Sequence, residues 1–331
     1  DGGDGGDGGD GGDGDEGGNG DGGGDGGDAS GHGEWEAGGS GGELLLATDW
    51  DVESLLPTKY AVMPIGADSL DLAHLAPREG ARCVLDLCCG SGVQGLVAAA
   101  TYADHVIAAD VSGRAVRFTA FNARLNGLSR RLQPVQSDLY AHPLIGASAP
   151  FDAILANPPF VAVPLRPIAE YAAWALYADG GPDGAAVSRR VVSGADACML
   201  RPGGWLCMTG ELPNVGAAHA WLPVGSLEVA VCYNPRHVQS AEEYAAMRAD
   251  ERPDHASADA WLVDMRAHGV DTMGNGFVFG VQRADGRPPT GRAVAIDGGA
   301  ETEDLSLLAG CGAAVRDVIA AVRADVCAVA G

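Results

Sequence analysis

The residues with the clearest capacity for chemistry stand in one short stretch, Asn157-Pro158-Pro159-Phe160. It follows six mostly apolar residues, 151–156, whose composition is typical of a short buried strand. Two consecutive prolines cannot continue a helix or donate to a sheet ladder, so the chain must leave this strand as a stiff, extended loop. The loop carries a carboxamide at its start and an aromatic ring at its end. We expect it to clamp a flat, polar group of a ligand.

A planar nitrogen, as in an amide or an exocyclic amine, would suit this clamp. Such a nitrogen is a poor nucleophile because its lone pair is delocalised. The side-chain carbonyl of Asn157 and the backbone carbonyl of Pro158 could each accept one of its N–H groups, and Phe160 could stack on its plane. Positioning of this kind can lower a barrier by about 7–11 kcal/mol. In the alternative, purely structural interpretation, the prolines only end the strand and Phe160 is a core residue.

Carboxylates also stand at the ends of three earlier predicted strands. These are Asp86 in 81–87, Asp110 in 104–110 and Asp138 in 131–138. A glycine-rich turn, residues 88–92, follows the first strand and would let a ligand approach the backbone closely. Unpaired buried carboxylates are costly, so packing alone does not explain three of them. Asp110, twenty residues after Gly90, is placed where a carboxylate can bind ribose hydroxyls.

The elements that must position these residues alternate along the chain. The predicted strands are 81–87, 104–110, 131–138, 151–157, 205–211, 226–234 and 274–284, and the main intervening helices begin after Gly92 and at residues 112 and 185. This alternation predicts an α/β fold with a doubly wound, seven-stranded, mostly parallel sheet. Ligands of such sheets bind outside the carboxyl ends of the strands, which is where the clamp and the carboxylates are expected.

Composition divides the chain further. Residues 1–42 repeat Asp and Gly with almost no apolar side chains, and we expect a disordered acidic tail. A helical lead-in (43–80) precedes the sheet domain (81–285), which contains a helical insertion at 241–268. Residues 286–331 are expected to form a linker and a C-terminal helix.

Charge and cysteine content exclude several classes of function. The net charge is −24, and removing the twelve acidic residues of 1–36 leaves 33 acidic against 21 basic residues, or −12. A broad basic face is absent, so nucleic acid is possible but not favoured as a partner. The arginine pairs at 130–131 and 189–190 are expected to be solvated. The sequence contains no run of about 18 apolar residues, so no membrane span is predicted. The eight cysteines form no CxxC pair, so we expect no metal site and buried free thiols in a reducing, cytoplasmic compartment.

Taken together, VLDLCCGSG (84–92), Asp110 and NPPF resemble the class I S-adenosylmethionine-dependent methyltransferases over roughly residues 60–285. The resemblance implies a Rossmann-like fold and S-adenosyl-L-methionine as cofactor. The family's first motif usually has Gly where this chain has Cys88, but Gly90 and Gly92 are retained. A dinucleotide-binding dehydrogenase would explain the glycine turn but not NPPF.

The resemblance also implies roles for single residues. Asp86, Cys89 and Gly90 are expected to line the methionine part, Asp110 to bind the ribose, and Asp138 and Leu139 to flank the adenine. The full implied cofactor set is Asp86, Cys88, Cys89, Gly90, Gly92, Asp110, Val111, Asp138, Leu139 and Asn157. The implied catalytic set is Asn157, Pro158, Pro159 and Phe160.

NPPF in this class marks transfer to a planar nitrogen. Within the class, the chain resembles the subgroup of release-factor glutamine methyltransferases and related small-domain ribosomal RNA guanine methyltransferases. MPIGADSL (63–70), Val161 after NPPF and GGPDGAAVSRRVV (180–192) are similar to a set of mainly bacterial predicted methyltransferases. We therefore expect a protein glutamine as acceptor, with a nucleobase amine or a small molecule as alternatives. A module that binds the cofactor without catalysis is a further alternative. Residues 161–184 are expected either to cover the active site or to pack on the sheet edge.

Overall fold

The computed structural model describes residues 43–49, 61–164, 176–222, 225–251, 256–296 and 311–327. The chain divides into two units, residues 1–43 and 44–331, and every helix and strand described below lies in the second. The predicted tail, 1–42, lies outside the described residues, as do residues 165–175 of the predicted cover.

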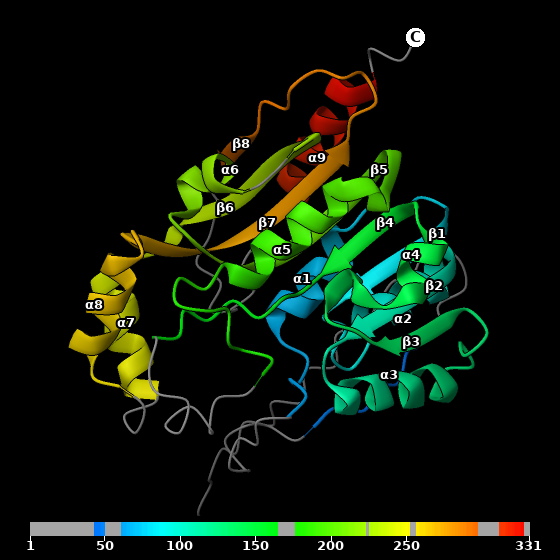
Figure 1. The fold of residues 1–331 in the computed structure, drawn as a ribbon, viewed down its shortest axis with the longest axis horizontal. Coiled ribbons are helices and arrows are strands. Elements are labelled where there is room, and N and C mark those ends of the chain that lie inside the picture. The colour runs from blue at the N-terminus through cyan, green and yellow to red at the C-terminus, as the bar shows by residue number, and fades with distance from the viewer. Residues whose placement is uncertain are drawn as a thin grey trace, which may run out of the picture. The chain divides into compact units, whose positions relative to one another are not determined.

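The fold is built on one eight-stranded mixed sheet (Figure 1). Its strands are β1 (Ala81–Leu87), β2 (Ala103–Asp110), β3 (Leu132–Gln136), β4 (Phe151–Ala156), β5 (Leu200–Pro213), β6 (Leu227–Ser240), β7 (Thr272–Gln282) and β8 (Arg292–Ala295). Their order is β3-β2-β1-β4-β5-β7-β6-β8, and only β7 runs antiparallel to its neighbours. The predicted α/β, mostly parallel fold is therefore confirmed.

The expected seven strands are joined by an eighth. Residues 292–295 were assigned to a linker, but they pair in parallel with β6 and give that strand a second neighbour. The strand is only four residues long and none of its residues is fully buried, so its apolar signal is weak.

Helices cover both faces of the sheet. They are α1 (Ala67–Leu75), α2 (Val93–Thr101), α3 (Gly113–Leu125), α4 (Pro143–Ser148), α5 (Ala186–Gly194), α6 (Ala218–Trp221), α7 (Ala241–Glu251), α8 (Ala258–Ala267) and α9 (Gly312–Cys327). A π-helical turn (Ala195–Met199) continues α5. Ser112, a predicted cap, accepts the Ala115 N–H at the start of α3. In the part of the chain that is described, no helix is long and apolar enough to cross a membrane.

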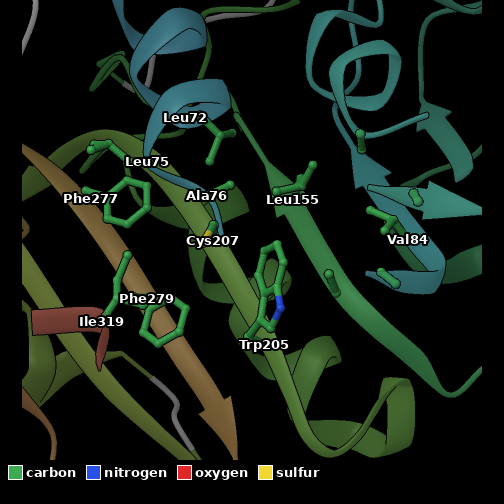
Figure 2. Close-up of a cluster of buried hydrophobic side chains, with 14 of the residues drawn as sticks. Leu72, Leu75, Ala76, Val84, Leu155, Trp205, Cys207, Phe277, Phe279 and Ile319 are labelled. Carbon is green, nitrogen blue, oxygen red and sulfur yellow. The ribbon is translucent and has the colours of Figure 1, made fainter. Parts of the chain in front are cut away.

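Side chains alternate between two hydrophobic cores, one on each face. Val84 of β1 faces the core formed with α1, α2 and α9, whereas Leu85 faces the core formed with α4, α5 and α6. Figure 2 shows the first core, in which side chains from both ends of the chain meet over the middle of the sheet. Its labelled members include Leu72 and Leu75 of α1, Trp205 and Cys207 of β5, Phe277 and Phe279 of β7, and Ile319 of α9. This packing fixes α1 against the sheet.

The strand order reverses between β1 and β4, which makes the carboxyl ends of these strands a topological switch point. Leu87, the last residue of β1, is paired with Ala156, the last residue of β4. The glycine turn and Asn157 therefore leave the sheet side by side, although about 70 residues separate them in the sequence.

The helices of the insertion, α7 and α8, stand apart from the sheet layers beyond β6 and β7 (Figure 1). Tyr244, Trp261 and Met265 are buried there against Val161 and Val163, which follow the NPPF stretch. The insertion thus forms a third core that supports the loop after β4.

Candidate active site

A cavity of about 510 Å³ opens at the carboxyl ends of β1 to β4. It is lined by eleven residues predicted from the sequence: Cys88, Cys89, Gly90, Asp110, Val111, Asp138, Leu139, Asn157, Pro158, Pro159 and Phe160. Asp86 and Gly92 are outside this lining. The structure therefore brings the glycine turn, two of the carboxylates and the whole NPPF stretch to one place.

Backbone hydrogen bonds shape the turn after β1. The N–H of Cys89 donates to the Ala109 carbonyl over 3.1 Å, and that of Gly92 donates to the Cys89 carbonyl over 2.6 Å. Gly92 has φ of +88°, and a Cβ there would lie 2.8 Å from a methyl carbon of Thr119. Glycine is needed at this position for the turn to pack closely against α3. Gly92 therefore shapes the turn that lines the cavity without lining the cavity itself.

Cys88 adopts a backbone conformation that favours glycine, with φ of +56°. This explains why the family usually has Gly here, and it costs an L-residue roughly 1–2 kcal/mol. Burial raises the pKa of its thiol well above the usual range, and the charges of Asp110, Asp86 and Asp138 raise it further. The thiol is therefore protonated at neutral pH and unsuited to act as a nucleophile.

Asp86 lies behind the turn and outside the cavity lining. It is 1% exposed, and its Oδ2 accepts the Gly95 N–H of α2 over 2.9 Å. Burial raises its pKa to about 8, opposed by the Gly95 hydrogen bond and reinforced by the charge of Asp110. Alternation along β1 turns the Asp86 side chain toward α2 and away from the cavity lining, and its role at the methionine part stays a prediction.

Asp110 is fixed at the cavity edge by two backbone donors. Its Oδ1 accepts from Ser112 N over 2.8 Å and its Oδ2 from Gly90 N over 3.0 Å. Burial raises its pKa, and the two hydrogen bonds oppose that rise. Each carboxylate oxygen can accept a second hydrogen bond, so the group can still bind two hydroxyls of a ligand.

At the end of β3, Asp138 pairs with Arg190 of α5 over 2.9 Å, and both side chains are more than half exposed. Leu139 is buried with φ of +49°. Arg190 is solvated, as predicted, and it also lines the cavity, which was not predicted. Its partner lies 52 residues away in the sequence, and no local signal indicates the pairing.

Asn157 is held from behind by α1. Its Nδ2 donates to Asp68 Oδ2 over 2.7 Å and to Ser69 Oγ over 3.2 Å. A carboxylate can only accept, so this contact defines which end of the amide faces α1. Within the described residues, Asn157 Oδ1 is buried and has no hydrogen-bond partner. Asp68 and Ser69 were not predicted as site residues, although the stretch MPIGADSL (63–70) that contains them was singled out by resemblance.

The loop after Asn157 is clipped to the stretch 178–181. Val161 N donates to Ala178 O over 2.8 Å, Gly180 N to Val161 O over 2.9 Å, and Val163 N to Gly181 O over 2.9 Å. Residues 176–179 also line the cavity, so this part of the predicted cover forms one of its walls. Glu170, Tyr171 and Trp174 lie outside the described residues.

A polar network from the insertion reaches the same cavity. Arg248 of α7 lines it and donates to Glu211 over 2.7 Å and to Glu251 over 2.8 Å. Tyr244 donates to Glu211 over 2.9 Å and lies under the Arg248 guanidinium. Among the described residues that line the cavity, both arginines are thus neutralised by carboxylates. Sequence reasoning gave the insertion no role, since these contacts link β5 to a helix 37 residues further on.

Comparison with known proteins identifies this arrangement. Residues 65–178 match the family model described as "Methyltransferase small domain". A "Release factor glutamine methyltransferase" from Moorella thermoacetica is 36% identical over 146 residues, which cover 43% of this chain and 41% of the relative. A "Ribosomal protein L11 methyltransferase" from Rhodopseudomonas palustris is 39% identical over 98 residues, which cover 29% of this chain and 32% of the relative. The chain therefore spans less than half the length of these curated relatives.

A solved structure described as a predicted O-methyltransferase from Agrobacterium tumefaciens aligns with a TM-score of 0.39 at 18% identity. The alignment covers 71% of this chain and 90% of that one.

The fold, the cavity and the family match define the class: the chain carries an S-adenosylmethionine-dependent methyltransferase domain of class I. More narrowly, residues 65–178 match the methyltransferase small domain family, for which the methyl donor is S-adenosyl-L-methionine.

The cavity residues fit this donor. Gln94 is 3% exposed and lines the cavity, and its Nε2 has no hydrogen-bond partner within the described residues, so it can donate to the methionine carboxylate. All three of Asp110, Val111 and Leu139 line the cavity, where Asp110 would accept from the ribose hydroxyls and Val111 and Leu139 would offer apolar surface to the adenine. No group of three metal-ligating side chains occurs in the described ranges.

Proposed function

We propose that the protein methylates the side-chain amide nitrogen of a glutamine in a protein acceptor, using S-adenosyl-L-methionine. The observation that carries the proposal is the state of Asn157. Both its N–H groups are directed to α1, its Oδ1 is buried without a hydrogen-bond partner within the described residues, and the residue lines the cavity together with the glycine turn and Asp110. An unsatisfied buried acceptor costs roughly 1–3 kcal/mol, and a substrate N–H would remove that cost.

The chain's own residues then act as a positioning device. Asn157 Oδ1 and the Pro158 carbonyl accept the two amide hydrogens, and Phe160 stacks on the amide plane. Both oxygens stabilise the positive charge that grows on the nitrogen during alkylation. The cofactor would supply the activated methyl group: its methyl–sulfur bond breaks with the electron pair left on sulfur, the nitrogen lone pair forms the new bond, and one amide proton leaves to water. Because Oδ1 is shielded from solvent in the free chain, acceptor binding must open the surrounding loops locally.

Phe160 can take this role because Gly210 of β5 leaves room for it. A Cβ at residue 210 would lie 3.0 Å from Cδ1 of the Phe160 ring. The ring is partly buried against the insertion core and also lines the cavity. One edge of the ring is therefore packed while the ring still contributes to the cavity wall.

Two observations favour a neutral protein amide over a nucleobase. Among the described residues, the arginines that line the cavity are Arg190 and Arg248, and each is paired with carboxylates, which weakens their attraction for a phosphate. The Moorella relative, 36% identical over 146 residues, is named for glutamine in a release factor. Translation factors and ribosomal proteins are cytoplasmic acceptors, so we place the activity in the cytoplasm. A nucleobase or small-molecule acceptor is the second candidate.

The test is transfer of a labelled methyl group from S-adenosyl-L-methionine to a cell extract, followed by separation of protein, RNA and small molecules. We expect label in protein as methylated glutamine. Label confined to RNA or to small molecules would contradict the glutamine proposal. Cofactor binding by calorimetry with no transfer to any fraction would favour a non-catalytic module, and binding of NAD in its place would favour an oxidoreductase.

Two variants separate binding from transfer. Asn157→Ala should lower kcat by about 100-fold or more, as removal of one preorganised group does elsewhere, and leave cofactor affinity nearly unchanged. Asp110→Ala should weaken cofactor binding. Full activity in Asn157→Ala would refute the clamp, and unchanged affinity in Asp110→Ala would remove that residue from the cofactor site.

A further inference from the structure

We propose that Asp68 is a positioning residue that orients and polarises the carboxamide of Asn157 for catalysis. The inference rests on the proposed function, because it concerns the same clamp. Asp68 lies in the first turn of α1, 89 residues before Asn157, and touches the acceptor only through that side chain.

The contact is buried and short. Asp68 and Ser69 are each 7% exposed, and the Asp68 Oδ2 to Asn157 Nδ2 distance is 2.7 Å. Gly66, which precedes α1, leaves space for the carboxylate, since a Cβ there would lie 2.5 Å from Asp68 Oδ1. Both N–H groups of the amide are used by α1, so its oxygen is the group left for a ligand.

The charge of Asp68 has a consequence at the far end of the amide. Hydrogen bonds in a chain polarise one another, and those to an ionised acceptor are the strong ones. A carboxylate that accepts from Nδ2 shifts electron density toward Oδ1. The oxygen then becomes a better acceptor for a nitrogen that is gaining positive charge, which is the charge that develops during methyl transfer.

A purely structural role for Asp68 makes different predictions. α1 is already anchored in the core by Leu72 and Leu75, which are almost fully buried. If Asp68 only helped to dock α1, exchanging the two side-chain types between positions 68 and 157 would restore nothing in catalysis. If it orients and polarises the clamp, the exchange should restore part of the activity.

The experiment compares Asp68→Asn, Asp68→Ala, Asn157→Asp and the double variant Asp68→Asn/Asn157→Asp. Asp68→Asn keeps an acceptor oxygen without its charge, and kcat should fall about tenfold with cofactor affinity unchanged. Asp68→Ala loses both the acceptor oxygen and the charge, and its kcat should fall about 100-fold. In Asn157→Asp, two carboxylates face each other across the contact that measures 2.7 Å in the wild type, so they must share a proton. The activity of this variant should be lowest above the pH at which that proton leaves.

In the double variant, the introduced asparagine can donate to the introduced carboxylate, and kcat should recover at least tenfold over Asn157→Asp alone. Asp71→Asn is the matched control, because it neutralises another buried carboxylate of α1 that is not in the clamp, and its kcat should equal that of the wild type. No recovery in the double variant, or an equal loss in Asp71→Asn, would overturn the inference.

A second measurement needs no acceptor. The melting temperature of Asn157→Asp should rise as the pH falls and the shared proton binds, and the double variant should lose this dependence. If this pattern appears but the wild type transfers no methyl group to any amide, the proposed function fails while the contact stands. If the wild type transfers methyl groups and neither the pattern nor the recovery appears, the inference on Asp68 fails alone.

Discussion

Gly184 lies so close to Phe160 that a Cβ at position 184 would overlap the Phe160 carbonyl oxygen. Gly184 also has φ of +76°, and its neighbour Gly180 would place a Cβ 2.7 Å from the Phe160 Cα. The stretch 180–184, which the sequence singled out by resemblance alone, therefore has a direct mechanical relation to NPPF. The backbone of 180–184 packs directly on the backbone of Phe160, with no side chain between them, and this contact fixes the position of the end of the NPPF stretch.

This contact predicts the effect of Gly184→Ala. The added methyl group must push residues 160–162 away, and the positive φ adds strain of roughly 1–2 kcal/mol. We expect kcat to fall about tenfold or more through displacement of Phe160, with cofactor affinity within about twofold of the wild type. Transfer assays and calorimetry on the same preparation measure both quantities.

The control for strain is Gly127→Ala. Gly127 has φ of +69° after α3, but a Cβ there meets no atom within 4 Å. This variant should share the loss of stability and keep full kcat. Equal kcat losses in the two variants would show that destabilisation, and not displacement of the clamp, accounts for the effect.

Asp86 predicts a dependence of stability on pH. Its folded-state pKa is about 8, whereas an unfolded aspartate titrates near 3.9. The folded chain therefore holds a proton that the unfolded chain releases between these values. Burying the Asp86 carboxyl is least unfavourable below pH 4, where it is protonated in both states. As the pH rises from 4 to about 8, its contribution lowers the free energy of unfolding by at most about 1.4 kcal/mol per pH unit.

Asp86→Asn should remove this dependence, because a neutral amide can keep the Gly95 hydrogen bond without a charge to bury. The measurement is the free energy of unfolding by denaturant at pH 5, 6, 7 and 8. The difference between variant and wild type should shift in favour of the variant as the pH rises. A difference that stays constant from pH 5 to 8 would mean that Asp86 is not protonated in the fold.

The sequence predicts the sheet because strand periodicity and helix punctuation are local. It also predicts that Asn157 and the glycine turn share an edge, since both follow buried parallel strands. It does not show that Asp86 is turned away from the cavity, because a position near a strand end does not say which face of the sheet a side chain takes. Alternation with Leu85 and Leu87 turns Asp86 toward α2 and away from the cavity.

The residues that contact the clamp cannot be predicted from local sequence patterns. Asp68 meets Asn157 only because α1 packs across the sheet, and Arg248 reaches the cavity only because the insertion packs on Val161 and Val163. Each contact depends on the tertiary arrangement of segments that the sequence predicts only to be helical.

Cys88 offers a last prediction, on the cost of departing from the family's glycine. At φ of +56°, Gly should be more favourable than Ala by about 1 kcal/mol, the reverse of the order in an ordinary strand. Comparing Cys88→Gly with Cys88→Ala isolates the backbone, because both variants lack the thiol. Free energies of unfolding should rank Cys88→Gly above Cys88→Ala, with cofactor affinity retained in both.

The matched pair is Cys207→Gly and Cys207→Ala, at a buried, extended position of β5. Here Ala should be the more stable by about 0.5–1 kcal/mol, because glycine loses more backbone entropy on folding. The two sites should thus show opposite signs for the same pair of substitutions. The same sign at both would mean that the left-handed conformation of Cys88 carries no strain, and the family's preference for glycine there would then have to come from close approach of the cofactor.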